Sequence, residues 1–178
     1  MANHVLVVGG QRSGKSRYAE RLVATSGRLA VYLATATAGD AEMAARIAAH
    51  RNRRAEDWRL VEEPLDIAAA IARVSRADTA VLVECLTLWL SNLMGADRDV
   101  GAATDDLIAA LARAAGPVVL VSNEVGSGIM PDNALARRYA DALGTLNQRV
   151  AAIATQVVLV VAGQPLILKP TQQPEVRL

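Results

Sequence analysis

The stretch GGQRSGKS, residues 9–16, has residue types at a spacing that suits phosphate binding. Gly9, four intervening residues and then Gly14, Lys15 and Ser16 fit the pattern G-x-x-x-x-G-K-[ST] without departure. Glycines let backbone N–H groups turn inward around phosphate oxygens, and a following helix adds its positive N-terminus. Lys15 would then reach the β- and γ-phosphates of a nucleotide, and the Ser16 hydroxyl would bind Mg²⁺. A glycine turn that binds nothing is the alternative, but the stretch, here called the P-loop, follows an apolar run and opens a helical one.

Carboxylate and amide side chains follow two other apolar runs. Glu84 stands near the end of TAVLVECL (79–86), where a carboxylate could complete a Mg²⁺-nucleotide site or merely cap the next helix. Asn123 and Glu124 follow PVVLVSN (117–123), in a glycine-containing stretch that suits either close approach to a ligand or a plain surface loop. The P-loop favours the functional reading of Glu84.

One of the two histidines lies among arginines. His50 falls in AARIAAHRNRR (44–54), and its neighbours are Arg46, Arg51, Arg53 and Arg54. An exposed helix face is one interpretation, and a nucleophile beside bound phosphate is the other. Nearby positive charges disfavour the imidazolium and keep the ring neutral, as nucleophilic attack on phosphorus requires. The same arginines could hold triphosphate oxygens and stabilise a departing pyrophosphate.

Short β-branched runs alternate with longer, alanine-rich helical stretches. The predicted strands are 4–10, 29–36, 58–63, 79–86, 117–123 and 157–163. The predicted helices are about 15–25, 40–54, 65–75, 86–94, 102–115 and 133–154. Most of the strands are continuously apolar, which is typical of parallel strands buried on both faces. The alternation predicts an α/β domain with right-handed crossovers, whose ligands bind beyond the carboxyl ends of the strands.

Length and composition limit the kind of protein. A chain of 178 residues is most simply one domain, residues 1–178, with a loop at 95–101 and a loose tail at 170–178. The single cysteine, Cys85, excludes an internal disulfide framework and fits the cytoplasm, and the N-terminus predicts no secretory signal. No apolar run approaches the roughly 18 residues of a membrane span. A net charge of +1 with 3% aromatic residues argues against a nucleic-acid partner.

These features leave the reaction open. The stretch SNEVG is not the N-K-x-D guanine-binding motif of a signalling GTPase. A P-loop kinase of another small metabolite, in which His50 only helps to bind phosphate, would fit the length. A nucleotide-binding module without catalysis would fit it as well.

Several stretches in order, spanning about residues 4–169, resemble the bifunctional adenosylcobinamide kinase / adenosylcobinamide-phosphate guanylyltransferase family. They are GGQRSGKSRYAE, YLATATAGDAEMAARIAAHRNRR, LVECLTLWLSNL, SNEVGSGIMP and LGTLNQRVAAIATQVVLVVAGQPLILK. The pair NEVG and LNQRVA is far more specific than the P-loop alone. Gln11 stands where relatives more often carry a small residue, at an unrestricted position of the P-loop.

The resemblance implies a RecA-like P-loop fold and two reactions in cobalamin biosynthesis. ATP or GTP, with Mg²⁺, would phosphorylate the aminopropanol hydroxyl of adenosylcobinamide, and GTP would then transfer GMP to adenosylcobinamide phosphate. The transfer would pass through a GMP-histidine at the position of His50. Relatives of this kind assemble as homo-oligomers, commonly trimers.

The resemblance also implies which residues form the site. Catalysis would fall to His50 and Lys15, and Mg²⁺ would bind at Ser16 and Glu84. Nucleotide contacts would come from the P-loop, from the end of the second predicted strand, from the residues around His50, and from the ends of the third and fourth predicted strands. These residues are Gly9, Gly10, Gln11, Arg12, Ser13, Gly14, Lys15, Ser16, Ala34, Thr35, Ala36, Arg51, Asn52, Arg53, Arg54, Glu62 and Glu84. Glu62 is the first candidate for reading guanine, because a carboxylate can accept from both N1–H and N2–H₂. His4, which opens the first strand, we interpret as structural.

Overall fold

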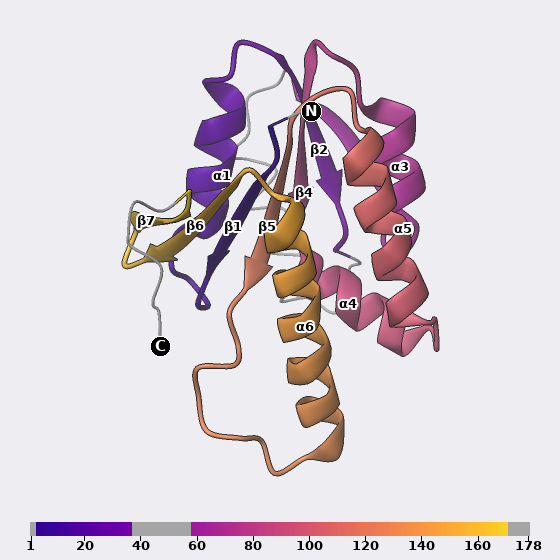
Figure 1. Ribbon diagram of the computed structural model, residues 1–178, viewed down its shortest axis with the longest axis vertical. Coiled ribbons are helices and arrows are strands. Elements are labelled where there is room, and N and C mark those ends of the chain that lie inside the picture. Colours follow the sequence, from indigo (N-terminus) through magenta and orange to yellow (C-terminus); the bar gives the residue numbers. More distant parts are fainter. Residues whose placement is uncertain (1–2, 37–57, 171–178) are drawn as a thin grey trace, which may run out of the picture.

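The computed structural model describes residues 3–36 and 58–170. Within these ranges seven strands form one sheet in the order β3-β2-β4-β5-β1-β6-β7 (Figure 1). They are β1 (Val5–Gly9), β2 (Leu29–Ala34), β3 (Arg59–Glu62), β4 (Thr79–Glu84), β5 (Val118–Asn123), β6 (Gln156–Val161) and β7 (Gln164–Lys169). Every neighbouring pair is parallel except β6 and β7, which are antiparallel. The predicted α/β class with a mostly parallel sheet is therefore confirmed.

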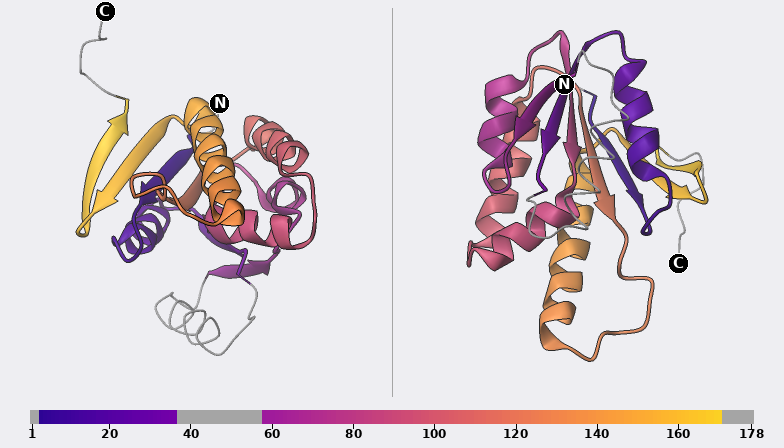
Figure 2. Two further views of the ribbon diagram at one scale, coloured as in Figure 1. Left: turned by 90° about the horizontal axis from the view of Figure 1, so that it is seen from below. Right: turned by 180° about the vertical axis from the view of Figure 1, so that it is seen from behind.

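Helices cover both faces of the sheet (Figures 1 and 2). One face packs against α1 (Lys15–Ala24), whose Ala19 and Val23 join Val5 and Val7 of β1 in a buried cluster. The other face packs against α3 (Ile67–Val74), α4 (Leu86–Gly95), α5 (Val100–Arg113) and α6 (Ala134–Ile153). The central strands β1, β4 and β5 are almost wholly buried, because apolar side chains on both of their faces meet a helix layer.

The strands β1, β2 and β5 point toward the same edge of the sheet, which carries the P-loop and the start of α4 (Figure 1). Because parallel strands all end at one edge, residues that follow different strands gather there. This edge is where the predicted site residues outside the 37–57 segment lie.

The hairpin β6–β7 is a departure from the sequence prediction. The sixth predicted strand ran through residue 163, whereas β6 ends at Val161 and the chain turns back to form β7. Ala162 and Gly163 have φ of 52° and 78°, so both central residues of the turn are left-handed, as a two-residue hairpin of matching twist requires. The prediction missed β7 because alanine in this turn position does not signal a hairpin.

Other element boundaries shift by a few residues. The predicted loop at 95–101 is shorter, because α5 begins at Val100 and the Asp99 side chain caps it, accepting from the Ala102 N–H at 3.0 Å. The predicted helix at 40–54 and the tail after residue 170 lie outside the described residues.

Candidate active site

The P-loop joins the end of β1 to the start of α1 and has no room for larger side chains at two of its glycines. A Cβ on Gly9 would meet Val160 O at 2.5 Å and Ser13 Oγ at 2.6 Å. Gly14, the N-cap of α1, has φ of 98°, and a Cβ there would meet Gly163 Cα at 3.1 Å. The first two glycine positions named in the sequence pattern are therefore required by close packing and by backbone conformation.

The hairpin turn supports the P-loop from the side. The backbone N–H of Gly163 donates to Ser13 O at 2.8 Å, and Gly163 Cα is the atom nearest to a Cβ built on Gly14. The β6–β7 hairpin, which the sequence prediction missed, thus helps to fix the loop that would hold phosphate.

The exposed part of the P-loop carries its potential phosphate ligands. Gly10, Gln11 and Arg12 are exposed, and Arg12 has φ of 57°. The Lys15 ammonium group reaches back across the loop to Gly10 O at 3.3 Å. A flexible ammonium that donates to one carbonyl among the described residues can turn to an anion, and phosphate binding by Lys15 stays a prediction.

Ser16 and Glu84 come together from α1 and β4. The Ser16 hydroxyl donates to Glu84 Oε1 at 2.6 Å, across 68 residues of sequence. A hydroxyl and a carboxylate oxygen are ligands that Mg²⁺ accepts, and they lie next to the first turn of α1. The pair fits a Mg²⁺-nucleotide site. Elsewhere, among the residues that the structure describes, no group of three or more His, Cys, Asp or Glu side chains could hold a metal ion.

Thr35, after β2, ties the end of that strand to the end of β4. Its backbone N–H donates to Glu84 O at 3.0 Å, and its hydroxyl accepts from the Cys85 N–H at 2.9 Å and lies 2.9 Å from Cys85 O. The side chain is fully buried, while Ala34 and Ala36 on either side are half-buried. Thr35 therefore holds the backbone that carries Glu84, and a direct nucleotide contact by these three residues stays a prediction.

Asn92 of α4 is a residue that sequence reasoning missed. Its side-chain amide donates to Thr35 O at 2.7 Å and to Pro64 O at 3.1 Å. These bonds connect the segments that follow β2 and β3. The signal in the sequence is slight, because the two partners lie 57 and 28 residues away.

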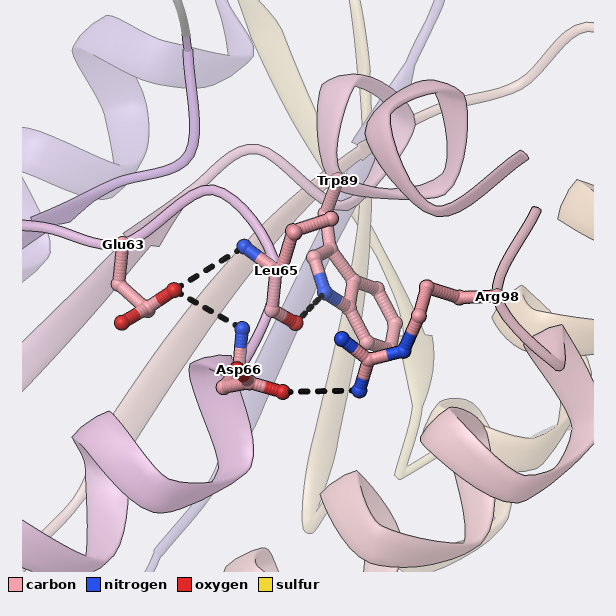
Figure 3. A network of polar contacts seen from close by, with 5 residues as sticks. All are labelled: Glu63, Leu65, Asp66, Trp89 and Arg98. Atoms are coloured by element: carbon pink, nitrogen blue, oxygen red, sulfur yellow. Dashed lines mark hydrogen bonds and ion pairs between the residues drawn. The ribbon is translucent and has the colours of Figure 1, made fainter. Parts of the chain in front are cut away.

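Glu62 and Glu63 at the end of β3 have different surroundings. Glu63 Oε1 accepts from the backbone N–H groups of Leu65 and Asp66 at 3.1 and 2.9 Å, just before α3 (Figure 3). Trp89 donates to Leu65 O at 2.6 Å, and Arg98 pairs with Asp66 at 3.1 Å, which fixes this connection. Glu62 is exposed and aligned with Ala34 of β2, so its carboxylate faces solvent near the ligand edge.

Cys85 directly follows Glu84 in the chain, but its thiol is not activated as a nucleophile. Burial, and secondly the negative charge of Glu84, raise the pKa of its thiol to about 11. A thiol with such a pKa is protonated at neutral pH, whereas thiolate chemistry needs the ionised form. Cys85 is therefore part of the buried cluster that also holds Ala19 and Val23 of α1.

The stretch after β5 lies beside the P-loop. Asn123 pairs with Gly9 in the β1–β5 register, and the Glu124 N–H donates to Gly9 O at 3.1 Å. The Asn147 side chain, from α6, donates to Asn123 O at 3.0 Å. The two most family-specific stretches, NEVG and LNQRVA, therefore meet at the edge of the sheet that carries the P-loop.

His4 has the structural role expected of it. Its ring is buried, with Nε2 2.9 Å from Leu111 O, and its Nδ1 accepts from the Val118 N–H at 3.2 Å. Burial lowers the pKa of His4, so the ring is held neutral. The other predicted histidine, His50, lies with Arg51, Asn52, Arg53 and Arg54 outside the described residues. The structure therefore leaves their predicted roles as predictions.

None of the helices in the described ranges is both long and apolar enough to span a membrane.

Solved structures share this fold at low sequence identity. The flagellar accessory protein FlaH from Methanocaldococcus jannaschii aligns with a TM-score of 0.56 and 13% identity, covering 94% of this chain and 78% of that one. The protein PH0250 from Pyrococcus horikoshii OT3 aligns with a TM-score of 0.54 and 10% identity, covering 93% of this chain and 85% of that one. At such identities the likeness concerns the fold alone.

Curated relatives are much closer in sequence. The bifunctional adenosylcobalamin biosynthesis protein CobP of Pseudomonas aeruginosa is 48% identical over 166 residues, covering 92% of this chain and 96% of that protein. Protein CobU of Escherichia coli, with the same description, is 43% identical over 174 residues, covering 89% of this chain and 96% of that protein. A family profile described as cobinamide kinase / cobinamide phosphate guanyltransferase matches residues 5–168. Since that match spans nearly the whole described fold, the chain belongs to the cobinamide kinase / cobinamide phosphate guanyltransferase family.

Proposed function

We propose that this protein phosphorylates the aminopropanol hydroxyl of adenosylcobinamide and then transfers GMP from GTP to the resulting phosphate. The observation that carries the proposal is the family match over residues 5–168, on a chain whose P-loop, Ser16 and Glu84 converge. Both reactions would use a nucleoside triphosphate, and one phosphate cradle lies among the described residues.

In the kinase step the hydroxyl oxygen of the substrate attacks the γ-phosphorus of ATP or GTP. The bond between that phosphorus and the β–γ bridging oxygen breaks, the nucleoside diphosphate leaves, and the hydroxyl proton passes to solvent water. Lys15 and the inward N–H groups of the P-loop stabilise the charge on the phosphate oxygens. Ser16 and Glu84 would hold Mg²⁺, which neutralises charge on the β- and γ-phosphates.

In the transferase step a ring nitrogen of His50 attacks the α-phosphorus of GTP and pyrophosphate leaves. The product is a GMP-histidine with a P–N bond. A phosphate oxygen of adenosylcobinamide phosphate then attacks this phosphorus, the P–N bond breaks, and adenosyl-GDP-cobinamide forms with His50 restored. Covalent catalysis divides one difficult transfer into two easier ones. The arginines flanking His50 in the sequence supply the positive charge that pyrophosphate departure requires.

Incubation with Mg²⁺ and α-labelled GTP tests this proposal. Intact-mass analysis should show one GMP added to the protein and pyrophosphate released, and the adduct should be lost in acid and survive alkali, as a phosphoramidate does. His50→Ala should form no adduct and make no GDP-cobinamide, while phosphorylation of adenosylcobinamide should largely persist. Adduct formation by His50→Ala, or transfer at a rate close to that of the unaltered protein, would refute the histidine route. GTP binding without any turnover would leave only a nucleotide-binding module.

We also propose that the protein is a homo-oligomer, a trimer by resemblance to its family. Large apolar side chains are exposed on the β5–α6 connection and on β7, as expected for surfaces that meet another copy. Among them Ile129 is 98% and Met130 68% exposed. Light scattering on the purified protein measures the oligomer mass, and a monomer across a wide concentration range would refute this proposal.

A further inference from the structure

Asn123, at the end of β5, has a backbone held by side chains from two helices. Its N–H donates to the Thr87 hydroxyl of α4 at 2.8 Å, and its carbonyl accepts from the Asn147 amide of α6 at 3.0 Å. The next residue, Glu124, donates its N–H to Gly9 O at 3.1 Å. Thr87 is held in turn, because the Tyr139 hydroxyl donates to Thr87 O at 2.8 Å. The position of Asn123 is therefore fixed from β1, α4 and α6.

The strand that carries Asn123 lies between the two strands that carry the phosphate machinery. β5 pairs with β1, where Gly9 opposite Asn123 begins the P-loop, and with β4, which ends at Glu84. The residue pairing between β4 and β5 extends as far as Val83 and Leu120. Asn123 thus ends the strand that lies between the strand leading into the P-loop and the strand ending at the carboxylate that would hold Mg²⁺.

Alternation along the strands gives the direction of the Asn123 side chain. Residues two apart on a strand share a face, so Asn123 lies on the face of Val119 and Val121. Those valines pack with Ala19 and Val23 of α1. Leu82 belongs to the same cluster, so Glu84, two residues later, lies on this face too, as its bond with Ser16 shows. Asn123 therefore faces the side of the sheet where α1 and its phosphate-binding N-terminus lie.

The Oδ1 atom of Asn123 is completely enclosed and has no hydrogen-bond partner among the residues that the structure describes. The amide nitrogen is therefore the atom of this side chain that can meet a ligand. An enclosed polar group without a partner costs about 1–3 kcal/mol. The two backbone bonds hold the residue in place at this cost. An uncharged amide fixed beside a phosphate cradle can donate to an anionic oxygen from its nitrogen.

We propose that Asn123 contacts the phosphoryl group that is transferred in the kinase step, with its Nδ2 donating to an oxygen of that group. Asn147 and Thr87 are positioning residues that act through the backbone of Asn123. The inference rests on the proposed kinase function. Charge on the transferred group is spread over its outer oxygens in the transition state, and a fixed donor lowers the energy of that state more than that of the bound substrate.

Asn123→Ala tests the contact. Loss of one fixed donor to a reacting oxygen typically lowers the rate about 10²–10³-fold, and kcat for adenosylcobinamide phosphorylation should fall by this order. The affinity for ADP, which lacks the transferred group, should stay unchanged. Ser122→Ala is the matched control: the preceding residue is buried on the opposite face of β5, its hydroxyl has no partner among described residues, and its removal should leave kcat unchanged. Asn123→Asp keeps the size of the side chain and the backbone bonds but repels phosphate, so its kcat should be as low as that of Asn123→Ala. This second variant tests the contact even if alanine disturbs the strand.

A double-mutant comparison tests the positioning role. Asn147→Ala should lower kcat by about tenfold through misplacement of Asn123. The double variant Asn123→Ala/Asn147→Ala should be no slower than Asn123→Ala alone, because Asn147 has nothing left to position. Gln148→Ala, the exposed neighbour on α6, is the control and should match the unaltered protein.

The outcomes separate the two proposals. If the unaltered protein does not phosphorylate adenosylcobinamide, the proposed function fails. If it does, and Asn123→Ala and Asn123→Asp keep its kcat, or lose ADP affinity as much as kcat, then the phosphoryl contact is wrong. If the fold-losses in kcat of Asn123→Ala and Asn147→Ala multiply in the double variant, Asn147 acts independently of Asn123, which overturns the positioning role.

Discussion

The Ser16 hydroxyl lies 2.6 Å from Glu84 Oε1, so the first turn of α1 and the end of β4 meet at one point. Glu84→Gln should keep a hydrogen bond to Ser16 but remove the negative charge that attracts Mg²⁺. The Mg²⁺ concentration for half-maximal kinase activity should rise by roughly 10–100-fold, the range that loss of a supporting metal interaction produces. A magnesium titration of both activities measures the shift. Unchanged curves, with a melting temperature like that of the unaltered protein, would make Glu84 a purely structural partner of Ser16.

Lys15→Ala should cripple both activities, because a single phosphate cradle lies among the described residues. The loss of a charged donor of this kind costs about 10²–10³-fold in rate. The chain has one other lysine, Lys169, which provides a matched control. Lys169 donates to the carbonyls of Ala151 and Ala152 at 2.9 Å each, near the end of α6 and away from the P-loop. Lys169→Ala should therefore keep both rates, and survival of either activity in Lys15→Ala would contradict a shared cradle.

Glu62→Gln should erode the preference of the transferase for GTP over ATP. The exposed carboxylate at the end of β3 can accept both guanine N1–H and N2–H₂, whereas an amide presents one acceptor. Competition between labelled GTP and ATP in adduct formation measures the preference. The neighbouring Glu63 is the comparison, because its Oε1 accepts from the backbone before α3. Glu63→Gln keeps an accepting oxygen there and should leave nucleotide choice unchanged. A Glu62→Gln protein with unaltered selectivity would place the guanine contact elsewhere.

Those features that depend on residues close together in the sequence could be predicted from it. Continuous apolar runs identified β1, β4 and β5, since a strand buried on both faces needs apolar residues throughout. The glycine and lysine spacing identified the P-loop, because those residue types are required within eight positions. Asn123 was predicted at the functional edge because it ends the apolar run of β5.

Contacts between distant segments could not be predicted in this way. Asn92 and Asn147 bind backbone carbonyls 57 and 24 residues away, and nothing near either residue in the sequence specifies those partners. One signal was present: Asn147 lies on the buried stripe of α6 formed by Leu143, Leu146 and Val150, where a polar side chain needs a partner. The strand β7 was missed because its turn depends on a left-handed Ala162 that local sequence does not favour.

Protonation of His4 should make the protein less stable in mild acid. Its Nδ1 accepts from the Val118 N–H, and its Nε2 lies against Leu111 O, so the neutral ring satisfies both neighbours. Protonation of Nδ1 would replace the acceptor by a donor facing a donor, and burial already lowers the pKa of His4. The folded state therefore binds this proton less readily than the unfolded state, in which the pKa is near 6.5. The stabilisation from neutral His4 is present above that pH and is lost as the pH falls below it toward the folded-state pKa. Denaturant unfolding between pH 7.5 and 5.5 should show falling stability, and His4→Gln, which does not titrate, should show a smaller slope although it is less stable throughout. His50 is present in both proteins, so its own titration cancels in the comparison, and equal slopes would show that His4 does not titrate on unfolding.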